Sequence, residues 1–222
     1  MIEAILFDLD GLMVDSERHS FASWRAVMAQ RGIDYDYATF ERTLGLSVPD
    51  TADLLSERYR LTGQSAELIH DKTEYQITRL DGNVQPMPGL IALLDAIDYY
   101  GLKKAVASSG RRRYVNAVLA ATHLDQRFGT IVSGDDVVNS KPAPDIFLAA
   151  AQALHVDPAQ CLVLEDAPAG VQAAKAAGMV CFAVPNDYTR RLDLSQAAAI
   201  MSSLFEVQAS LPRLLEGVVR AA

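Results

Sequence analysis

Short apolar runs recur along the chain and predict the strands of a buried sheet. Most of these runs are continuous and do not alternate with polar residues, which is typical of parallel strands covered on both faces. The six runs are residues 4–7, 105–107, 130–132, 162–164, 181–184 and 198–201.

Helical patterns separate these runs from about residue 85 onward. In residues 90–100 the apolar positions are spaced by three and four, so one face of a helix is apolar. Similar patterns occupy residues 114–121, 145–154 and 169–177, the last of which stops at Gly178. Because strand and helix alternate, we predict an α/β fold with a doubly wound, Rossmann-like parallel sheet.

The first strand is separated from the rest of this series by a long helical segment. Residues 16–30, 37–44, 49–59 and 65–80 show helical patterns, and no strand pattern interrupts them. We therefore predict a core domain made of residues 1–14 and 84–222, and a small all-helical domain made of residues 15–83. The linkers near 13–16 and 81–86 are the expected hinges between the two domains, and proline and glycine mark the second of them.

Composition excludes several classes of protein. The net charge is −8, so the protein would repel phosphates at long range, and we expect no binding to nucleic acid or to an anionic membrane. No apolar stretch reaches the roughly 18 residues of a membrane span. Acidic residues near the N-terminus do not fit a signal peptide, and the two cysteines, Cys161 and Cys181, lie in apolar runs. We expect a soluble, cytoplasmic monomer with two buried thiols.

Two carboxylates follow the first predicted strand. Asp8 and Asp10 are two residues apart, so both lie on the same side of the chain at the carboxyl end of a parallel strand, where such sheets bind ligands. Two neighbouring carboxylates repel each other unless a cation or a proton separates them, so they suit a magnesium site or an acid–base pair. A solvated turn is the simpler alternative.

Three further polar groups follow predicted strands. Hydroxyl groups and backbone N–H groups of Ser108, Ser109 and Gly110 could hold phosphate oxygens, or they could only begin a helix. Lys141 precedes a proline that restricts the backbone, so its ammonium could neutralise a carboxylate or a phosphoryl group; a surface lysine is the alternative. Glu165 and Asp166 could complete a metal site begun by Asp8, or Asp166 could cap a helix.

In this order and at these positions, the four groups make the sequence resemble the haloacid-dehalogenase superfamily. The resemblance covers nearly the whole chain, and the first motif, DLDGLMVDSE, is the most specific. The helical insert resembles the cap of the subgroup that contains β-phosphoglucomutase and phosphoglycolate-type phosphatases. The resemblance implies a phosphotransferase whose active site lies between the core and this cap.

The resemblance also implies roles for individual residues. Asp8 is the expected nucleophile, which becomes an aspartyl-phosphate, and Asp10 is the expected general acid and base. Magnesium would be held by Asp8, the backbone carbonyl of Asp10 and Asp166, with Glu165 as a direct ligand or as a partner of the ligands.

The resemblance further implies which residues act on the phosphoryl group. Ser108 would bind a phosphoryl oxygen, with help from Ser109. Lys141 would stabilise Asp8 and the charge that develops during transfer.

Among the reactions of this superfamily, hydrolysis of a phosphate ester is favoured. The dehalogenases and the phosphonate-cleaving members lack an acid at the position of Asp10. A mutase of this subgroup has a histidine four residues before the tryptophan, where this chain has Ser20, and His19 is one place earlier. Such a mutase also has an arginine in the cap loop, where residues 45–49 here read GLSVP.

We therefore predict a magnesium-dependent phosphatase that acts on a small phosphorylated metabolite, such as a sugar phosphate. A sugar phosphomutase is the alternative. A phosphoaccepting receiver, which also places carboxylates and a lysine on a doubly wound sheet, would have neither the cap nor an acid two residues after the nucleophile.

Substrate selection is expected to depend on the cap. Its candidate residues are Leu44, Gly45, Leu46 and Ser47 between two predicted helices, and Lys72 and Gln76 one turn apart on another. Ordinary packing or a solvated face is the simpler explanation for each of them taken singly, and a solvated helix face is the simpler explanation for His19.

Overall fold

A computed structural model describes residues 1–80 and 82–216, and within them six strands form one parallel sheet. The order across the sheet is β3-β2-β1-β4-β5-β6, and every neighbouring pair is parallel. The predicted α/β class is therefore confirmed. The strands are β1 (Ala4–Phe7), β2 (Lys103–Ala107), β3 (Ile131–Val132), β4 (Cys161–Glu165), β5 (Val180–Ala183) and β6 (Ala199–Ile200).

Strand β1 lies at the centre of the sheet, between β2 and β4. Ala4 is in register with Lys103 on one side and with Cys161 on the other, and all four residues of β1 are fully buried. This burial on both faces explains why the run AILF contains no polar residue. The carboxyl ends of β1, β2 and β4 therefore meet at one edge of the sheet.

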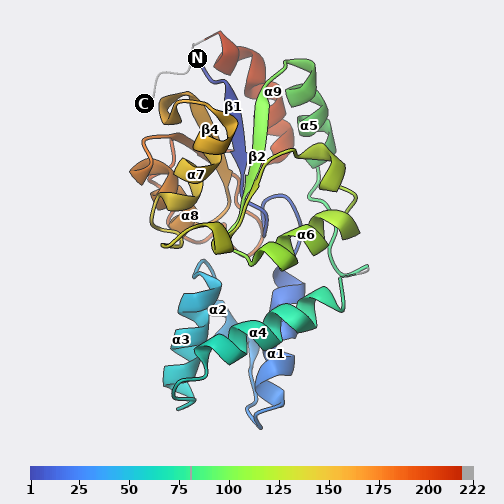
Figure 1. The fold of residues 1–222 in the computed structure, drawn as a ribbon, viewed down its shortest axis with the longest axis vertical. Coiled ribbons are helices and arrows are strands. Elements are labelled where there is room, and N and C mark those ends of the chain that lie inside the picture. Colours follow the sequence, from blue (N-terminus) through green and yellow to red (C-terminus); the bar gives the residue numbers. More distant parts are fainter. Residues whose placement is uncertain (81, 217–222) are drawn as a thin grey trace.

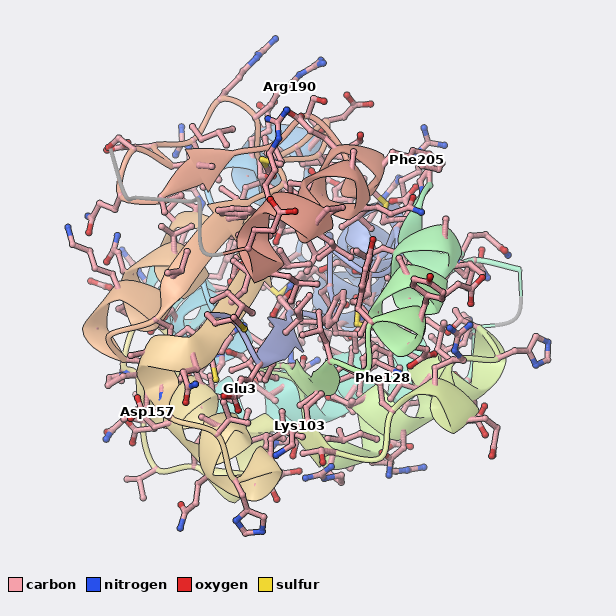
Figure 2. All side chains as sticks on the ribbon, turned by 90° about the horizontal axis from the view of Figure 1, so that it is seen from above. Glu3, Lys103, Phe128, Asp157, Arg190 and Phe205 are labelled. Atoms are coloured by element: carbon pink, nitrogen blue, oxygen red, sulfur yellow. The ribbon has the colours of Figure 1, made fainter. Side chains whose placement is uncertain are left out.

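Helices cover both faces of the sheet. The core cluster on one face includes α5 (Leu90–Tyr99), α6 (Arg112–Ala121) and α9 (Leu204–Leu215), and the cluster on the other includes α7 (Asp145–Leu154) and α8 (Pro168–Ala176). Figure 2 looks along the strands from the end that carries Glu3 and Lys103, with α5 and α7 on opposite sides. Short 3₁₀ helices span Asp125–Arg127, Gly134–Asp136 and Pro158–Gln160.

Helix α9 has no counterpart among the predicted helices. Its buried residues Leu204, Val207, Leu211 and Leu214 have helical spacing and pack beside α5. Pro212 lies inside the helix, and a proline in a helix interior argues against a helix at the level of sequence.

Four helices are inserted between β1 and α5. They are α1 (Glu17–Ala29), α2 (Tyr37–Glu41), α3 (Val48–Arg58) and α4 (Ser65–Ile77). In Figure 1 they lie together at the carboxyl edge of the sheet, on the far side from the N-terminus, and α4 contacts α6. They have an apolar core of their own that includes Trp24, Tyr35 and Leu55.

The chain enters and leaves this helical region at one place. Val14 pairs with Pro86 in an isolated antiparallel bridge, and the Asp15 N–H donates to the Gln85 carbonyl at 2.9 Å. The predicted boundaries, 1–14 with 84–222 and 15–83, stay a prediction, but this crossing point lies beside them.

Two other features of the sequence have a counterpart in the structure. Cys161 and Cys181 are buried free thiols within the core, as predicted. None of the helices in the described parts of the chain has the length and hydropathy that a membrane crossing requires.

Candidate active site

The seven residues predicted to form the site lie around one cavity at the carboxyl edge of the sheet. The cavity is about 140 Å³ in volume. Its lining includes Asp8, Asp10, Ser108, Ser109, Lys141, Glu165 and Asp166, and also residues of the helical region. Residues far apart in the sequence meet here because β1, β2 and β4 are adjacent and parallel.

Three carboxylates lie close enough to share one cation. Oxygen atoms of Asp8, Glu165 and Asp166 lie within 4.8 Å of one another. Glu165 is the last residue of β4, and Asp8 directly follows β1, so the pairing of β1 with β4 sets this spacing. Oxygen ligands of this kind suit a hard divalent cation such as magnesium.

Lys141 connects two of these carboxylates. Its buried Nζ donates to Asp8 Oδ1 at 2.5 Å, to Glu165 Oε1 at 2.7 Å and to the Ala107 carbonyl at 3.0 Å. All three of its N–H donors therefore have partners. The other oxygen of Glu165 accepts from the backbone N–H groups of Asp166 and Ala167.

The site carries more negative than positive charge. With all groups ionised, one ammonium faces three buried carboxylates, which leaves two negative charges uncompensated. Burial, together with Glu165, raises the pKa of Asp8 although Lys141 lowers it, and burial raises the pKa of Asp166 well above its ordinary range. Burial lowers the pKa of Lys141, but Asp8 and Glu165 more than offset it. A divalent cation would balance this charge.

Asp10 lies apart from the three carboxylates. Its Oδ1 accepts a hydrogen bond of 2.6 Å from the hydroxyl group of Tyr114, a residue of α6. It is followed by Gly11, whose φ of +81° suits glycine and whose position has no room for a side chain, because a Cβ would lie 2.4 Å from Asp166 Oδ2. The tight turn at Gly11 thus brings the chain back against Asp166.

The two serines after β2 differ in their partners. Ser108 Oγ accepts from the Gly110 N–H at 3.1 Å. Ser109 Oγ is buried and, among the described residues, has no hydrogen-bond partner. A buried hydroxyl without a partner is costly, so a ligand oxygen in the cavity is the partner that would satisfy it.

The helical region faces this site with a polar cluster. Lys72 is buried, donates to Gln76 Oε1 at 2.7 Å and has its Nζ 5.5 Å from the centre of the Trp24 ring. Lys72 and Gln76 line a second cavity, of about 120 Å³, that adjoins the first. Glu17, Asp10 and Tyr114 also line this second cavity. Burial raises the pKa of Glu17 to about 7, and repulsion from Asp10 adds to the rise.

The other candidates in the helical region have different surroundings. The expectation of a solvated face is wrong for His19, which is buried and whose Nε2 lies 3.0 Å from the Gln76 carbonyl oxygen; its side chain connects α1 to α4. The segment from Leu44 to Ser47 reaches the core, because a Cβ on Gly45 would lie 3.1 Å from Leu192 and 3.4 Å from Pro168.

Three polar residues of the site are not among those predicted from the sequence. Tyr114 lies in a predicted helix, and Glu17 is the last residue of the first motif, but neither has a predicted role. Asn186 donates to Asp166 Oδ2 at 2.9 Å and to the Gly11 carbonyl at 3.1 Å. Position in the motif could have indicated Glu17, but no pattern indicates Tyr114 or Asn186.

Comparison with known proteins agrees with this geometry. Residues 2–178 match the family model described as haloacid dehalogenase-like hydrolase. The chain is 34% identical to the fructose-1-phosphate phosphatase YqaB of Escherichia coli, over 79% of this chain and 92% of that protein. It is 33% identical to the β-phosphoglucomutase of Bacillus subtilis, over 82% and 83% of the two chains.

A solved structure extends the likeness to three dimensions. CbbY from Rhodobacter sphaeroides, solved in complex with phosphate, superposes with a TM-score of 0.85 at 28% identity, over 93% of this chain and 96% of that one. A mutant of the same protein has been solved with xylulose-(1,5)bisphosphate. This chain belongs to the haloacid dehalogenase-like hydrolases and is a phosphatase of that family, in which helices α1–α4 form the cap.

Proposed function

We propose that this phosphatase hydrolyses a small sugar phosphate, needs magnesium and works through an aspartyl-phosphate on Asp8. The observation that carries the proposal is the buried group in which Lys141 bridges Asp8 and Glu165 beside Asp166. A lysine that neutralises one oxygen of Asp8 fixes this carboxylate in the lining of the cavity, where it can face a phosphorus atom.

The residues present fit a magnesium ion. Asp8, Asp166 and the backbone carbonyl of Asp10 would hold it, and its charge would offset the negative charge of the carboxylates and of the bound phosphate. Both oxygens of Glu165 already have partners in Lys141 and two backbone N–H groups. We therefore assign Glu165 the task of orienting Lys141 and the ligands around it.

The transfer proceeds in two steps on these residues. An oxygen of Asp8 attacks phosphorus and the bond to the ester oxygen breaks, while Asp10 gives that oxygen a proton. Asp10 then takes a proton from water as this water attacks the phosphorus of the aspartyl-phosphate, which frees Asp8 and inorganic phosphate. Ser108 and Ser109 hold phosphoryl oxygens, and the Ser109 hydroxyl, which has no partner among the described residues, supports its share of this task. Lys141, whose three N–H donors already have partners, stabilises Asp8 and the charge that develops beside it.

The polar residues of the cap favour a polar substrate. Lys72, Gln76 and Glu17 face the cavity that adjoins Asp10, so they offer an ammonium, an amide and a carboxyl group to hydroxyl or anionic groups of the substrate. A sugar phosphate has hydroxyl groups that match such donors and acceptors. Fructose 1-phosphate and xylulose 1,5-bisphosphate, named with the relatives above, are the first compounds to assay.

A sugar phosphomutase is the second candidate, because a β-phosphoglucomutase is among the relatives of this length and identity. The serine at position 20 and the segment GLSVP at 45–49 argue against it. Conversion of β-glucose 1-phosphate to glucose 6-phosphate, measured beside phosphate release, separates the two activities.

The experiment that tests the proposal is Asp8→Asn assayed with these esters and with p-nitrophenyl phosphate. The amide keeps the shape of the side chain but is a poor nucleophile, so phosphate release should fall to background while the circular dichroism spectrum stays unchanged. Asp34→Asn, at an exposed cap carboxylate, is the matched control and should keep full activity. Turnover by Asp8→Asn at the rate of the unmodified enzyme would mean that another group is the nucleophile.

A further inference from the structure

Tyr114 contacts Asp10, the proposed general acid and base, and the mechanism above gives this contact no role. Its hydroxyl group donates to Asp10 Oδ1 at 2.6 Å, although the two residues are 104 positions apart in the sequence. The side chain is 5% exposed and belongs to the main core cluster. A phenol ordinarily keeps its proton at neutral pH, so the hydroxyl group of Tyr114 is the donor and the Asp10 carboxylate the acceptor.

Local packing and hydrogen bonds fix Tyr114 and the start of α6. The ring of Tyr114 packs against the Ser-Ser-Gly turn so closely that a Cβ on Gly110 would lie 3.1 Å from its Cδ1. The first turn of α6 is anchored as well, because Asp135 accepts from the Arg112 N–H at 2.8 Å and from Arg111 Nη1 at 2.7 Å. The phenol oxygen therefore has a defined position relative to the phosphate-binding turn.

The other oxygen of Asp10 is available for chemistry. Within residues 1–80 and 82–216, no hydrogen bond holds Asp10 Oδ2, and Asp10 lines both the central cavity and the one shared with the cap. A carboxyl group that lines a cavity, with one oxygen fixed and the other without a hydrogen bond, can transfer a proton at the second oxygen.

We infer that Tyr114 is a positioning residue for Asp10: its hydroxyl group fixes Oδ1 and thereby orients Oδ2 toward the leaving oxygen of the substrate. The inference deepens the proposed function and rests on it. It predicts that loss of the hydroxyl group slows those reactions that need a proton on the leaving group. An alkyl ester such as fructose 1-phosphate needs this proton, whereas p-nitrophenolate leaves without one.

The test compares kcat/KM for the two esters in Tyr114→Phe, which keeps the ring. Since kcat/KM reports the steps up to release of the leaving group, it should fall about tenfold for fructose 1-phosphate and less than twofold for p-nitrophenyl phosphate. Tyr35→Phe removes another buried tyrosine hydroxyl, 3.5 Å from Thr43 Oγ1 in the cap, and should change neither value more than twofold.

Asp10→Asn separates failure of this inference from failure of the proposed function. It should show the same preference for the aryl ester, and adding Tyr114→Phe to it should change alkyl turnover less than twofold further. Equal losses on both esters in Tyr114→Phe, no loss, or full additivity with Asp10→Asn would overturn the role of Tyr114 alone. Undiminished alkyl turnover in Asp10→Asn would overturn the role of Asp10 and, with it, that of Tyr114.

Discussion

At the scale of single residues, the site depends on close approaches that leave no room for extra atoms. Gly170, in the first turn of α8, lies so near Glu165 that a Cβ would come within 1.7 Å of Oε1. We predict that Gly170→Ala displaces Glu165 from Lys141. Because this breaks a buried ion pair, the free energy of unfolding should fall by about 3 kcal/mol and kcat by at least about tenfold.

Denaturant unfolding and steady-state kinetics measure these two effects. Gly129→Ala is the matched control, because a Cβ at Gly129 meets nothing within 4 Å. A Gly170→Ala enzyme with the stability and the kcat of the unmodified protein would show that the Lys141–Glu165 pair has no such role.

Lys72 should make KM for the sugar phosphate depend on pH. Burial lowers its pKa to about 8, and Asp10 and Glu17 partly offset this effect. The ammonium charge is therefore present at pH 7 and largely lost at pH 9. If Lys72 binds an anionic or hydroxyl group of a sugar phosphate, KM for that ester should rise about tenfold over this range.

Lys72→Arg keeps its charge at pH 9, so its KM should rise severalfold less between pH 7 and pH 9 than that of the unmodified enzyme. The rise that remains would come from Glu17, which has a pKa of about 7 and lines the same cavity. p-Nitrophenyl phosphate lacks the sugar and should show no comparable rise in either enzyme. The same rise with both esters would place the pH effect on the phosphoryl site and not on Lys72.

The residues that follow strands were predictable from the sequence, and those that approach from elsewhere were not. Asp8, Ser108 and Glu165 each end or follow an apolar run, so the parallel sheet implies that they meet. Tyr114 reaches Asp10 only through the packing of α6 against the sheet edge, and nothing near it in the sequence shows this contact. Lys72 and Gln76 were candidates, but the sequence did not distinguish a buried pair from a solvated face.

At the scale of elements, the loop between α2 and α3 brings residues of the cap into the lining of the active-site cavity. Leu46 is 43% exposed, lines the central cavity and follows Gly45, which lies against Pro168 of the core. We predict that Leu46→Gln changes the ranking of sugar phosphates by kcat/KM severalfold, while p-nitrophenyl phosphate changes less than twofold.

Leu148→Gln on α7, at a leucine that is 39% exposed, is the control and should leave the ranking unchanged. If Leu46→Gln instead lowered kcat/KM by the same factor for every ester, this loop would only close the site and would not select the substrate.

Strands were easier to predict than the last helix for a physical reason. A continuous apolar run has few alternatives to a buried parallel strand, and β1 has the predicted bounds. Strand β2 begins two residues earlier than predicted, because Lys103 and Lys104 pair with β1 although they are polar. Helix α9 depends on packing against α5, which overrides the unfavourable Pro212.

At the scale of the whole molecule, a negatively charged enzyme has to bind a negatively charged substrate. The net charge is −8, and the site adds its own uncompensated carboxylates. We predict that exhaustive chelation abolishes activity, that magnesium restores it and that calcium inhibits, because calcium takes more ligands in looser geometry. Magnesium should also raise the melting temperature of the unmodified enzyme but not of Asp166→Asn. Full activity after chelation would contradict the metal requirement.

The division of the molecule into core and cap is proposed to control access to the site. The cavity between them includes residues of both, and the chain crosses between them at the bridge of Val14 with Pro86. Opening at this crossing would admit substrate, and closing would exclude stray water from the phosphorylated Asp8. The boundaries at 15–83, the monomeric state and the cytoplasmic location stay predictions.

Trapping the phosphoryl group on Asp8 is the decisive measurement for this enzyme. Asp10→Asn lacks the base that activates water, so a labelled phosphoryl group from p-nitrophenyl phosphate should accumulate on it and survive an acid quench. We expect near-stoichiometric label, removed by hydroxylamine, in the peptide that contains Asp8, and none in Asp8→Asn. Label on another residue, or label retained in Asp8→Asn, would contradict this expectation.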